Sequence, residues 1–323
     1  MADDEAPDPP RDRGPLRSLL ELGVLCSFAI AQPLLDLTGR SPETFVFYRV
    51  DGLEVVAFAL LIVVVPPVGL WLAITGIAML SSRAGLVAYA VVAGSLVALI
   101  VLQAAKKLSD LRGPVLVGLA AVVAVGALWL IARSAAARTF VTFLTPAPLV
   151  FALLFLLASP TGALVRPGQD GTVADGTDRD GPAPPVVMIL LDELPLVSLL
   201  DSTGQVDERV FPNFARLAGT SHWFRNATAV SGYTQSAVPS ILTGRTPEPG
   251  VAPSYVEHPD NLFSLLAPDY RIRPFETITQ LCDPAMCEEA ELREDDRGLG
   301  GLFGQTWQVA KALAKPYDDT API

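Results

Sequence analysis

The chain has 323 residues, 51% of them hydrophobic, and a formal net charge of −11 at pH 7. The charge is divided unevenly, because residues 1–166 carry a net charge of +1 and residues 167–323 a net charge of −12. An acidic second half repels nucleic acid phosphates, which argues against DNA or RNA as a partner.

The first half contains five apolar stretches after a short polar tail. Residues 1–14 carry Pro and both signs of charge, which is typical of a disordered tail. A helix that crosses a bilayer needs about 20 apolar residues, and each stretch is long enough. The stretches lie near residues 16–37, 54–80, 85–104, 114–133 and 140–159. They predict a transmembrane domain over residues 15–160.

Polar residues and prolines interrupt the first two stretches. Glu21, Gln32 and Asp36 break the first one, which leaves a cleaved signal peptide as an alternative to a first span. Pro66 and Pro67 lie within the second stretch and are expected to kink it or to split it into two half-helices.

The basic residues between the spans do not orient the bundle. With a cytoplasmic N-terminus, six Lys and Arg residues lie in cytoplasmic segments and six lie outside. The positive-inside rule therefore favours neither orientation of the bundle. Five spans nevertheless place the two ends of the domain on opposite sides of the membrane. Residues 161–185 are rich in Gly, Asp and Pro, which predicts a flexible linker before a domain at 186–323.

That domain opens with the apolar run VVMILL at 186–191, which ends at Asp192 and Glu193. A short apolar run bounded by polar residues is typical of a buried strand in an α/β sheet, where functional groups gather beyond the carboxyl ends of the strands. Acidic residues at this point can also simply begin the next helix. Further strands are predicted at 223–230 and 270–277, and helices at 196–201, 211–218, 261–266 and 306–314.

Three cysteines are present. Cys26 lies in an apolar stretch and is expected to be a buried small hydrophobe. Cys282 and Cys287 are close enough in sequence for a disulfide, which would place the domain in an oxidising, extracytoplasmic compartment, whereas two free thiols are the alternative. No second Cys or His pair supports a structural zinc site.

Four segments in this order resemble the N-terminal half of a sulfatase domain of the alkaline phosphatase superfamily. They are VVMILLDE at 186–193, FPNFARL at 211–217, WFRNA at 223–227 and LTGR at 242–245. In sulfatases the nucleophile is a Cys or Ser matured to formylglycine, nine residues before the Thr of Leu-Thr-Gly. This spacing falls on Thr234, and the Cys-x-Pro-Ser-Arg maturation motif is absent. A Thr nucleophile is instead what the membrane-bound phosphoethanolamine transferases and lipoteichoic acid synthase-like members use.

The resemblance implies a partial α/β domain that hydrolyses or transfers phosphate or sulfate esters. Asp192 and Glu193 would bind a divalent metal ion (Zn, Mn, Mg or Ca), and Thr234 would be both a metal ligand and the nucleophile. The metal would lower the pKa of the Thr234 hydroxyl, and Arg245 would contact the substrate anion.

The same resemblance implies a location and a substrate class. Lipoteichoic acid synthase-like relatives also place five helices before an external catalytic domain. The chain is therefore expected to be a multi-pass protein of the cell membrane, in contact with membrane lipids, with an extracytoplasmic C-terminal domain. A lipid-linked or cell-envelope phosphate or sulfate ester is the expected substrate.

The sequence departs from the family in its metal ligands. Relatives complete the site with Asp and His from the second half of the domain, typically in an Asp-His-Gly segment. This sequence has only His222 and His258 and no Asp-His pair. We therefore expect a domain that is truncated at its C-terminal side, as a fragment or a natural truncation. Such a domain would bind its metal weakly. These observations leave open whether the chain is an enzyme. The alternative is a non-catalytic membrane protein with a degenerate binding lobe. A transporter fits less well, because the spans lack a charged pathway.

Overall fold

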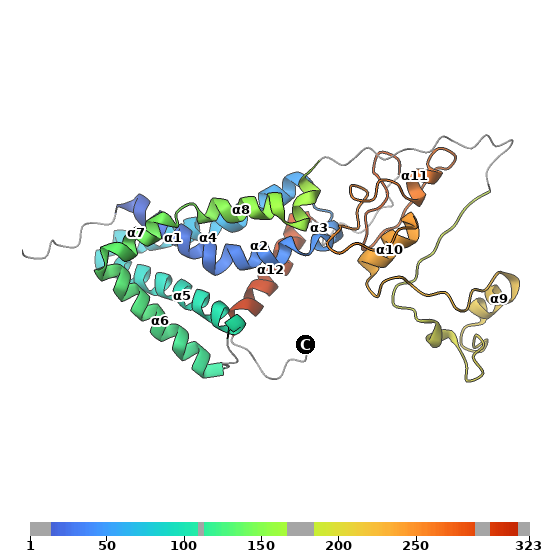
Figure 1. The fold of residues 1–323 in the computed structure, drawn as a ribbon, viewed down its shortest axis with the longest axis horizontal. Helices are drawn as coiled ribbons and strands as arrows, with labels where there is room; N and C mark the ends of the chain where they lie inside the picture. Colours follow the sequence, from blue (N-terminus) through green and yellow to red (C-terminus); the bar gives the residue numbers. More distant parts are fainter. Residues whose placement is uncertain (1–13, 109–112, 167–183, 288–297, 316–323) are drawn as a thin grey trace, which may run out of the picture. The chain divides into compact units, whose positions relative to one another are not determined.

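The computed structural model describes residues 14–108, 113–166, 184–287 and 298–315, and it consists of two compact units (Figure 1). Unit 1 contains Met1–Pro167, Gly250–Ala252 and Arg293–Ile323, and unit 2 contains Gly168–Pro249 and Pro253–Leu292. The predicted disordered tail lies outside the described residues except for Gly14, and so do residues 167–183 of the predicted linker.

Unit 1 is helical, and five of its described segments are long and apolar enough to span a membrane. These segments confirm the five predicted apolar helices and fit a multi-pass membrane protein. The first consists of α1 (Pro15–Cys26), the π-helical η1 (Ser27–Ala31) and α2 (Gln32–Gly39). The next three are α4 (Gly52–Leu80), α5 (Ser82–Leu108) and α6 (Gly113–Arg133), and the last combines α7 (Ala135–Phe143) with α8 (Ala147–Ala158). A short helix, α3 (Pro42–Phe47), joins the first two spans.

The π-helical turn in the first span has an identifiable cause in Pro33. Proline has no backbone N–H, so the carbonyl of Ala29, four residues earlier, loses its usual helical partner. The side-chain amide of Gln103 on α5 donates a hydrogen bond of 3.1 Å to this carbonyl. The bond satisfies a polar group that would be costly to leave unpaired in a lipid environment, and it links the first and third spans.

The sequence predicted that Pro66 and Pro67 would kink the second span or split it into two half-helices. The split does not occur. α4 continues through both prolines from Gly52 to Leu80. A proline removes a single helical hydrogen bond, and helices in a membrane tolerate this where neighbouring groups cover the freed carbonyl. The start of α4 is fixed by a capping box, in which Asp51 accepts from the Glu54 N–H at 2.7 Å and Glu54 accepts from the Asp51 N–H at 3.0 Å.

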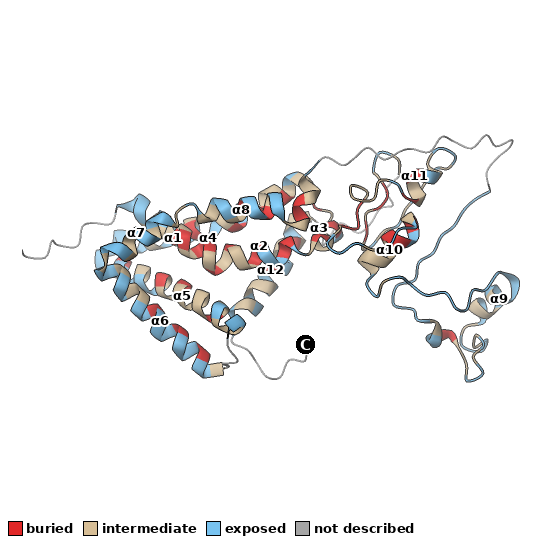
Figure 2. Ribbon diagram, viewed as in Figure 1, coloured by how far each residue is buried: buried red, intermediate tan, exposed pale blue. Residues whose placement is uncertain are grey.

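The main core of unit 1 is a cluster of aromatic and aliphatic side chains that includes Phe45, Phe58 and Phe155. Figure 2 shows that buried residues follow α2, α3 and α4, whereas much of α6 is exposed, as expected for a lipid-facing helix. The cluster also includes Leu302 of α12 (Gly298–Ala314), which is fully buried. The sequence predicted only 306–314 as helix and placed it in the C-terminal domain. In the structure α12 begins at Gly298 and belongs to unit 1, because its apolar face packs on the bundle.

Three hydrogen bonds hold the two ends of α12. The Gly298 N–H donates to the carbonyl of Tyr48 at 2.7 Å. At the other end, Lys106 of α5 donates to the carbonyl of Leu313 at 3.1 Å and also bonds the carbonyl of Lys315. A cation at a helix C-terminus satisfies the last carbonyls and opposes the negative end of the helix dipole.

The segment that follows α8 is also held on the bundle. Pro160–Val165 forms a 3-10 helix, η2, in which the buried Thr161 hydroxyl contacts the carbonyls of Thr38 and Gly39 at 2.9 and 3.1 Å. Ser159 caps this turn by accepting from the Gly162 N–H. The first residues of the predicted linker, 161–165, are therefore structured, because their polar groups find partners on α2.

Unit 2 contains short helices and no strand within its described residues. The structure confirms the predicted helices as η3 (Leu196–Leu199), α9 (Pro212–Thr220) and α11 (Leu262–Leu266), and it adds α10 (Thr234–Thr243). The β-type pairings in this part of the chain are three isolated bridges, Leu200–Val206, Ser254–Gln280 and Ile272–Cys287.

The strands predicted at 186–191, 223–230 and 270–277 are not formed, and the α/β fold class is not shown. A strand needs a neighbour that pairs with its N–H and C=O groups, and the run at 186–191 has no such neighbour among the described residues. Its side chains are also largely exposed, with Val187 at 81% and Ile189 at 73%.

Candidate functional site

Two residues that the sequence singled out, Asp192 and Thr234, meet in unit 2. The Thr234 hydroxyl donates a hydrogen bond of 2.8 Å to the Oδ1 atom of Asp192, across 42 positions of sequence. This distance lies within the range that joins a nucleophile to an adjacent base.

Thr234 takes this position because it is the first residue of α10. Tyr233 before it is extended, and the Tyr233 carbonyl accepts hydrogen bonds from Ser236 and Ala237, which closes the first helical turn. The first N–H groups of a helix have no partner within the helix and carry the positive end of its dipole. The start of α10 thus brings a hydroxyl and a partial positive charge to the carboxylate of Asp192.

The chain turns sharply directly after Asp192. Glu193 has a φ of 53°, in the left-handed region that a residue with a side chain rarely adopts. Such a conformation costs of the order of 1–3 kcal/mol and is common at functional sites. Glu193 itself is exposed, and no described contact joins its side chain to Thr234.

A cavity of about 500 Å³ adjoins the pair within unit 2. Asp192 and Thr234 line it together with the apolar run at 186–191, the body of α10 and residues 270–279. Arg271 and Arg273 belong to this lining. Sequence analysis missed both arginines. Their spacing of two residues within a predicted strand places both side chains on one face, and this pattern could have indicated an anion-binding surface.

The loop after these arginines is held by the carboxylate of Glu276. It accepts hydrogen bonds from the Thr279 hydroxyl at 2.7 Å, the Leu281 N–H at 2.7 Å and the Cys282 N–H at 2.9 Å. Cys282 is joined to Cys287 by a disulfide with the Cα atoms 6.2 Å apart. The wall of the cavity that carries the arginines therefore continues into a cross-linked loop.

Arg245, which the sequence proposed as the anion contact, lies at the other end of α10. It follows Gly244, the left-handed C-cap of this helix, so the helical rise places it about 16 Å from Thr234. Its guanidinium pairs with Asp260 at 3.7 Å. His258 lies near this pair, and its pKa is lowered by burial and then by the charge of Arg245. The structure thus does not bring Arg245 to the Asp192–Thr234 pair.

No protein family model, curated protein or solved structure matches this chain. The resemblance to sulfatases therefore rests on the four sequence segments alone.

The described residues do not fit a complete metal site. No group of three or more His, Cys, Asp and Glu side chains in this part of the chain lies close enough together to hold an ion. Asp192, Glu193 and the Thr234 hydroxyl could supply oxygen ligands, which suit Mg²⁺, Mn²⁺ or Ca²⁺. Mg²⁺ and Ca²⁺ take six or more ligands and Zn²⁺ takes four, so these three donors do not complete the coordination shell of any of these ions on their own.

Proposed function

We propose that the chain is a membrane-anchored hydrolase or transferase of phosphate or sulfate esters, with Thr234 as its nucleophile. The hydrogen bond between Thr234 and Asp192 carries this proposal, because it joins a hydroxyl to a carboxylate at the start of a helix and beside a cavity. The four segments that resemble a sulfatase domain support the same reaction class.

The geometry suits a two-step transfer. In the first step Oγ1 of Thr234 forms a bond to the phosphorus or sulfur atom, its proton passes to Oδ1 of Asp192, and the bond to the leaving alcohol breaks with the electron pair on that oxygen. In the second step the oxygen of water or of an acceptor hydroxyl forms a bond to the same phosphorus or sulfur atom and the bond to Oγ1 of Thr234 breaks. Oγ1 takes back its proton from Asp192, and the proton of the acceptor neutralises the released alkoxide through solvent. A carboxylate within 2.8 Å orients the hydroxyl for this attack.

The cavity lining carries the carboxylates of Asp192 and Glu276, and it also offers basic groups that would suit an anionic ester. The start of α10 offers N–H groups and the helix dipole, which favour phosphate or sulfate oxygens. Arg271 and Arg273 add guanidinium groups to the lining, and such groups bind these anions strongly. The divalent ion that the resemblance implies is not used in these steps, because the described donors do not fit it.

We further propose that unit 2 lies outside the cytoplasm. A disulfide between Cys282 and Cys287 persists in oxidising compartments and is rare in the cytosol. Lipid-linked or cell-envelope esters would be the substrates within reach there.

A second candidate is a non-catalytic lobe, and two observations favour it. The described residues lack enough metal donors, and the apolar run at 186–191 has no strand partner. In this case Asp192 and Thr234 would only fix the start of α10.

Trapping the covalent intermediate separates the two candidates. The purified chain is incubated with p-nitrophenyl phosphate or p-nitrophenyl sulfate, with and without divalent metal, quenched in acid and analysed by peptide mass spectrometry. We expect the label on Thr234, its loss in Thr234→Ala and a decrease of about 100-fold or more in Asp192→Asn, the usual effect of losing a general base.

Ser236→Ala is the matched control, since it removes a hydroxyl from the same helix turn and should retain the label. Labelling of Ser236, or an unchanged rate in Asp192→Asn, would show that the nucleophile or its base is misassigned. A parent chain that never takes up label under any condition would favour the non-catalytic lobe.

A further inference from the structure

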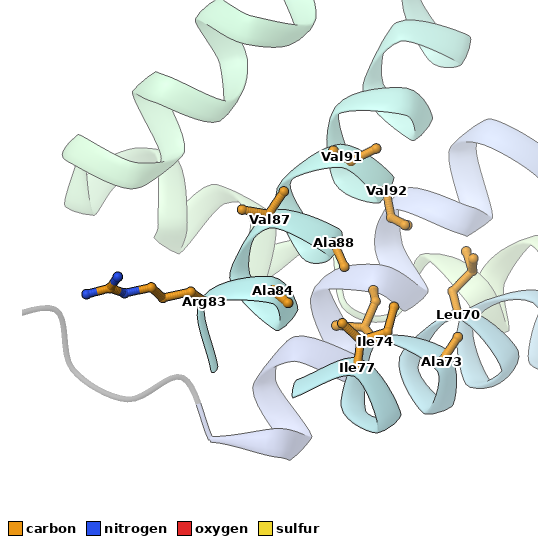
Figure 3. Close-up of a pocket in the computed structure, with 10 residues that line it drawn as sticks. All are labelled: Leu70, Ala73, Ile74, Ile77, Arg83, Ala84, Val87, Ala88, Val91 and Val92. Atoms are coloured by element: carbon orange, nitrogen blue, oxygen red, sulfur yellow. The ribbon is translucent and has the colours of Figure 1, made fainter. Parts of the chain in front are cut away.

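An apolar groove runs between the second and third spans of unit 1. It has a volume of about 620 Å³ and lies between the C-terminal half of α4 and the N-terminal half of α5 (Figure 3). Its lining is apolar except at one end, where Arg83 stands as the second residue of α5. The groove opens on the surface of the bundle, where Val87 and Val91 of its lining are exposed.

The groove has a packed floor and a closed end. Leu70, Ile74 and Val92 form part of its lining and pack against the buried cluster of Leu22 and Leu96. Near Arg83 the two helices approach so closely that a Cβ atom added to Gly85 would lie only 2.5 Å from the Cβ of Ala78. The separation of α4 and α5 is thus set by contacts, and small side chains such as Ala73 and Ala88 leave the space open.

The length of the groove matches one leaflet. From Arg83 to Val92 the helical rise is about 14 Å, close to the roughly 15 Å that half of a 30 Å hydrocarbon core occupies. A lipid acyl chain from one leaflet fills such a length. A transmembrane helix from a second copy would need a complementary stripe across both leaflets, which the groove does not offer.

Arg83 gives the groove a charged end. Its side chain is exposed, forms no ion pair with the described residues and extends away from Leu70, Ala73 and Ile74 in Figure 3. Three other arginines of the spans, in contrast, interact with partners in the protein. Arg17 pairs with Glu21 at 3.1 Å, Arg133 lies over the ring of Trp129 at 5.4 Å, and Arg138 donates to backbone carbonyls.

We propose that this groove binds one anionic diacyl phospholipid. One acyl chain lies along α4 and α5, and the phosphate pairs with the guanidinium of Arg83, which reaches toward the headgroup region. Basic sites between transmembrane helices are a known way to hold anionic lipid headgroups. The proposal is independent of the chemistry assigned to Thr234.

Native mass spectrometry of the full chain in detergent micelles tests the charge. Dioleoyl phosphatidylglycerol and dioleoyl phosphatidylcholine are added in equal amounts, and we expect phosphatidylglycerol to be retained preferentially. Arg83→Gln should weaken its binding about fivefold, the factor for one basic residue near an anionic lipid, while Arg83→Lys retains most of it. Arg133→Gln, which removes an arginine outside the groove, should leave binding unchanged. Equal retention of both lipids, or an unchanged Arg83→Gln variant, would overturn the proposal.

A second pair of variants tests the groove itself. Ala88→Phe fills the space between the helices and should abolish retention of phosphatidylglycerol. Ala121→Phe makes the same change on an exposed face of α6 and should have no effect. Binding that survives in Ala88→Phe, or that is lost equally in Ala121→Phe, would show that the acyl chain does not occupy the groove.

Discussion

Leu302→Ala should release α12 from the transmembrane bundle. Leu302 is fully buried in the cluster that contains Phe45, Phe58 and Phe155. Truncating a fully buried Leu to Ala costs 2–5 kcal/mol, which combines the lost contacts with the cavity left behind. We take about 3 kcal/mol for this site, because the neighbouring Phe303, whose ring lies 5.2 Å from that of Phe58, keeps part of the contact. If the helix opens locally, this cost raises the open population about 150-fold.

Hydrogen exchange of the detergent-purified chain measures this opening. Peptides from Gly298–Ala314 should exchange faster by about two orders of magnitude in Leu302→Ala, while peptides from α4 stay protected. Leu53→Ala is the control, since it removes the same atoms from a residue that is 78% exposed at the start of α4. Unchanged exchange of α12 in Leu302→Ala would refute the assignment of this helix to the bundle.

Three further predictions concern unit 2. Alkylation before reduction should leave Cys282 and Cys287 unmodified in mass spectrometry, and reduction should lower the free energy of unfolding by about 2 kcal/mol for so short a loop; ready alkylation would argue against the bridge. The lowered pKa of His258 means that the unfolded chain takes up the proton first, so stability should fall as the pH drops below about 6.5. A His258→Gln variant should show a smaller pH slope in thermal unfolding, and an equal slope would exclude this histidine. Ser202→Cys should react with an impermeant maleimide in intact cells, whereas labelling only after lysis would reverse the proposed orientation.

Local features of the sequence predicted the helices well. The five spans follow from long apolar stretches, because a helix satisfies its own backbone groups wherever lipid surrounds it. The start of α11 follows from Asn261, whose side chain accepts from the N–H groups of Phe263 and Ser264. In each case the residues that decide the structure lie within a few positions of one another.

Features that depend on distant partners were not predictable in this way. A strand at 186–191 requires a neighbour that no local pattern supplies. The partner of the Ala29 carbonyl in the π-helical turn is Gln103, which lies 74 residues away along the chain. The pairing of Asp192 with Thr234 was reached only through the resemblance to sulfatases, and Arg271 and Arg273 were missed because that resemblance assigns them no role.

The placement of α12 bears on how unit 2 would meet a substrate. The chain leaves the bundle through η2, where Thr161 is bonded to α2, and returns to it at Gly298, which bonds Tyr48. Unit 2 is thus joined in sequence to the bundle on both sides, and a second connection of this kind would raise the effective concentration of the domain near a membrane that the bundle spans. For the ester chemistry proposed at Thr234, a substrate carried by the membrane would gain most from this connection. If the proposed chemistry at Thr234 holds, releasing α12 by Leu302→Ala should slow turnover of a lipid-borne ester while leaving a soluble aryl ester unaffected.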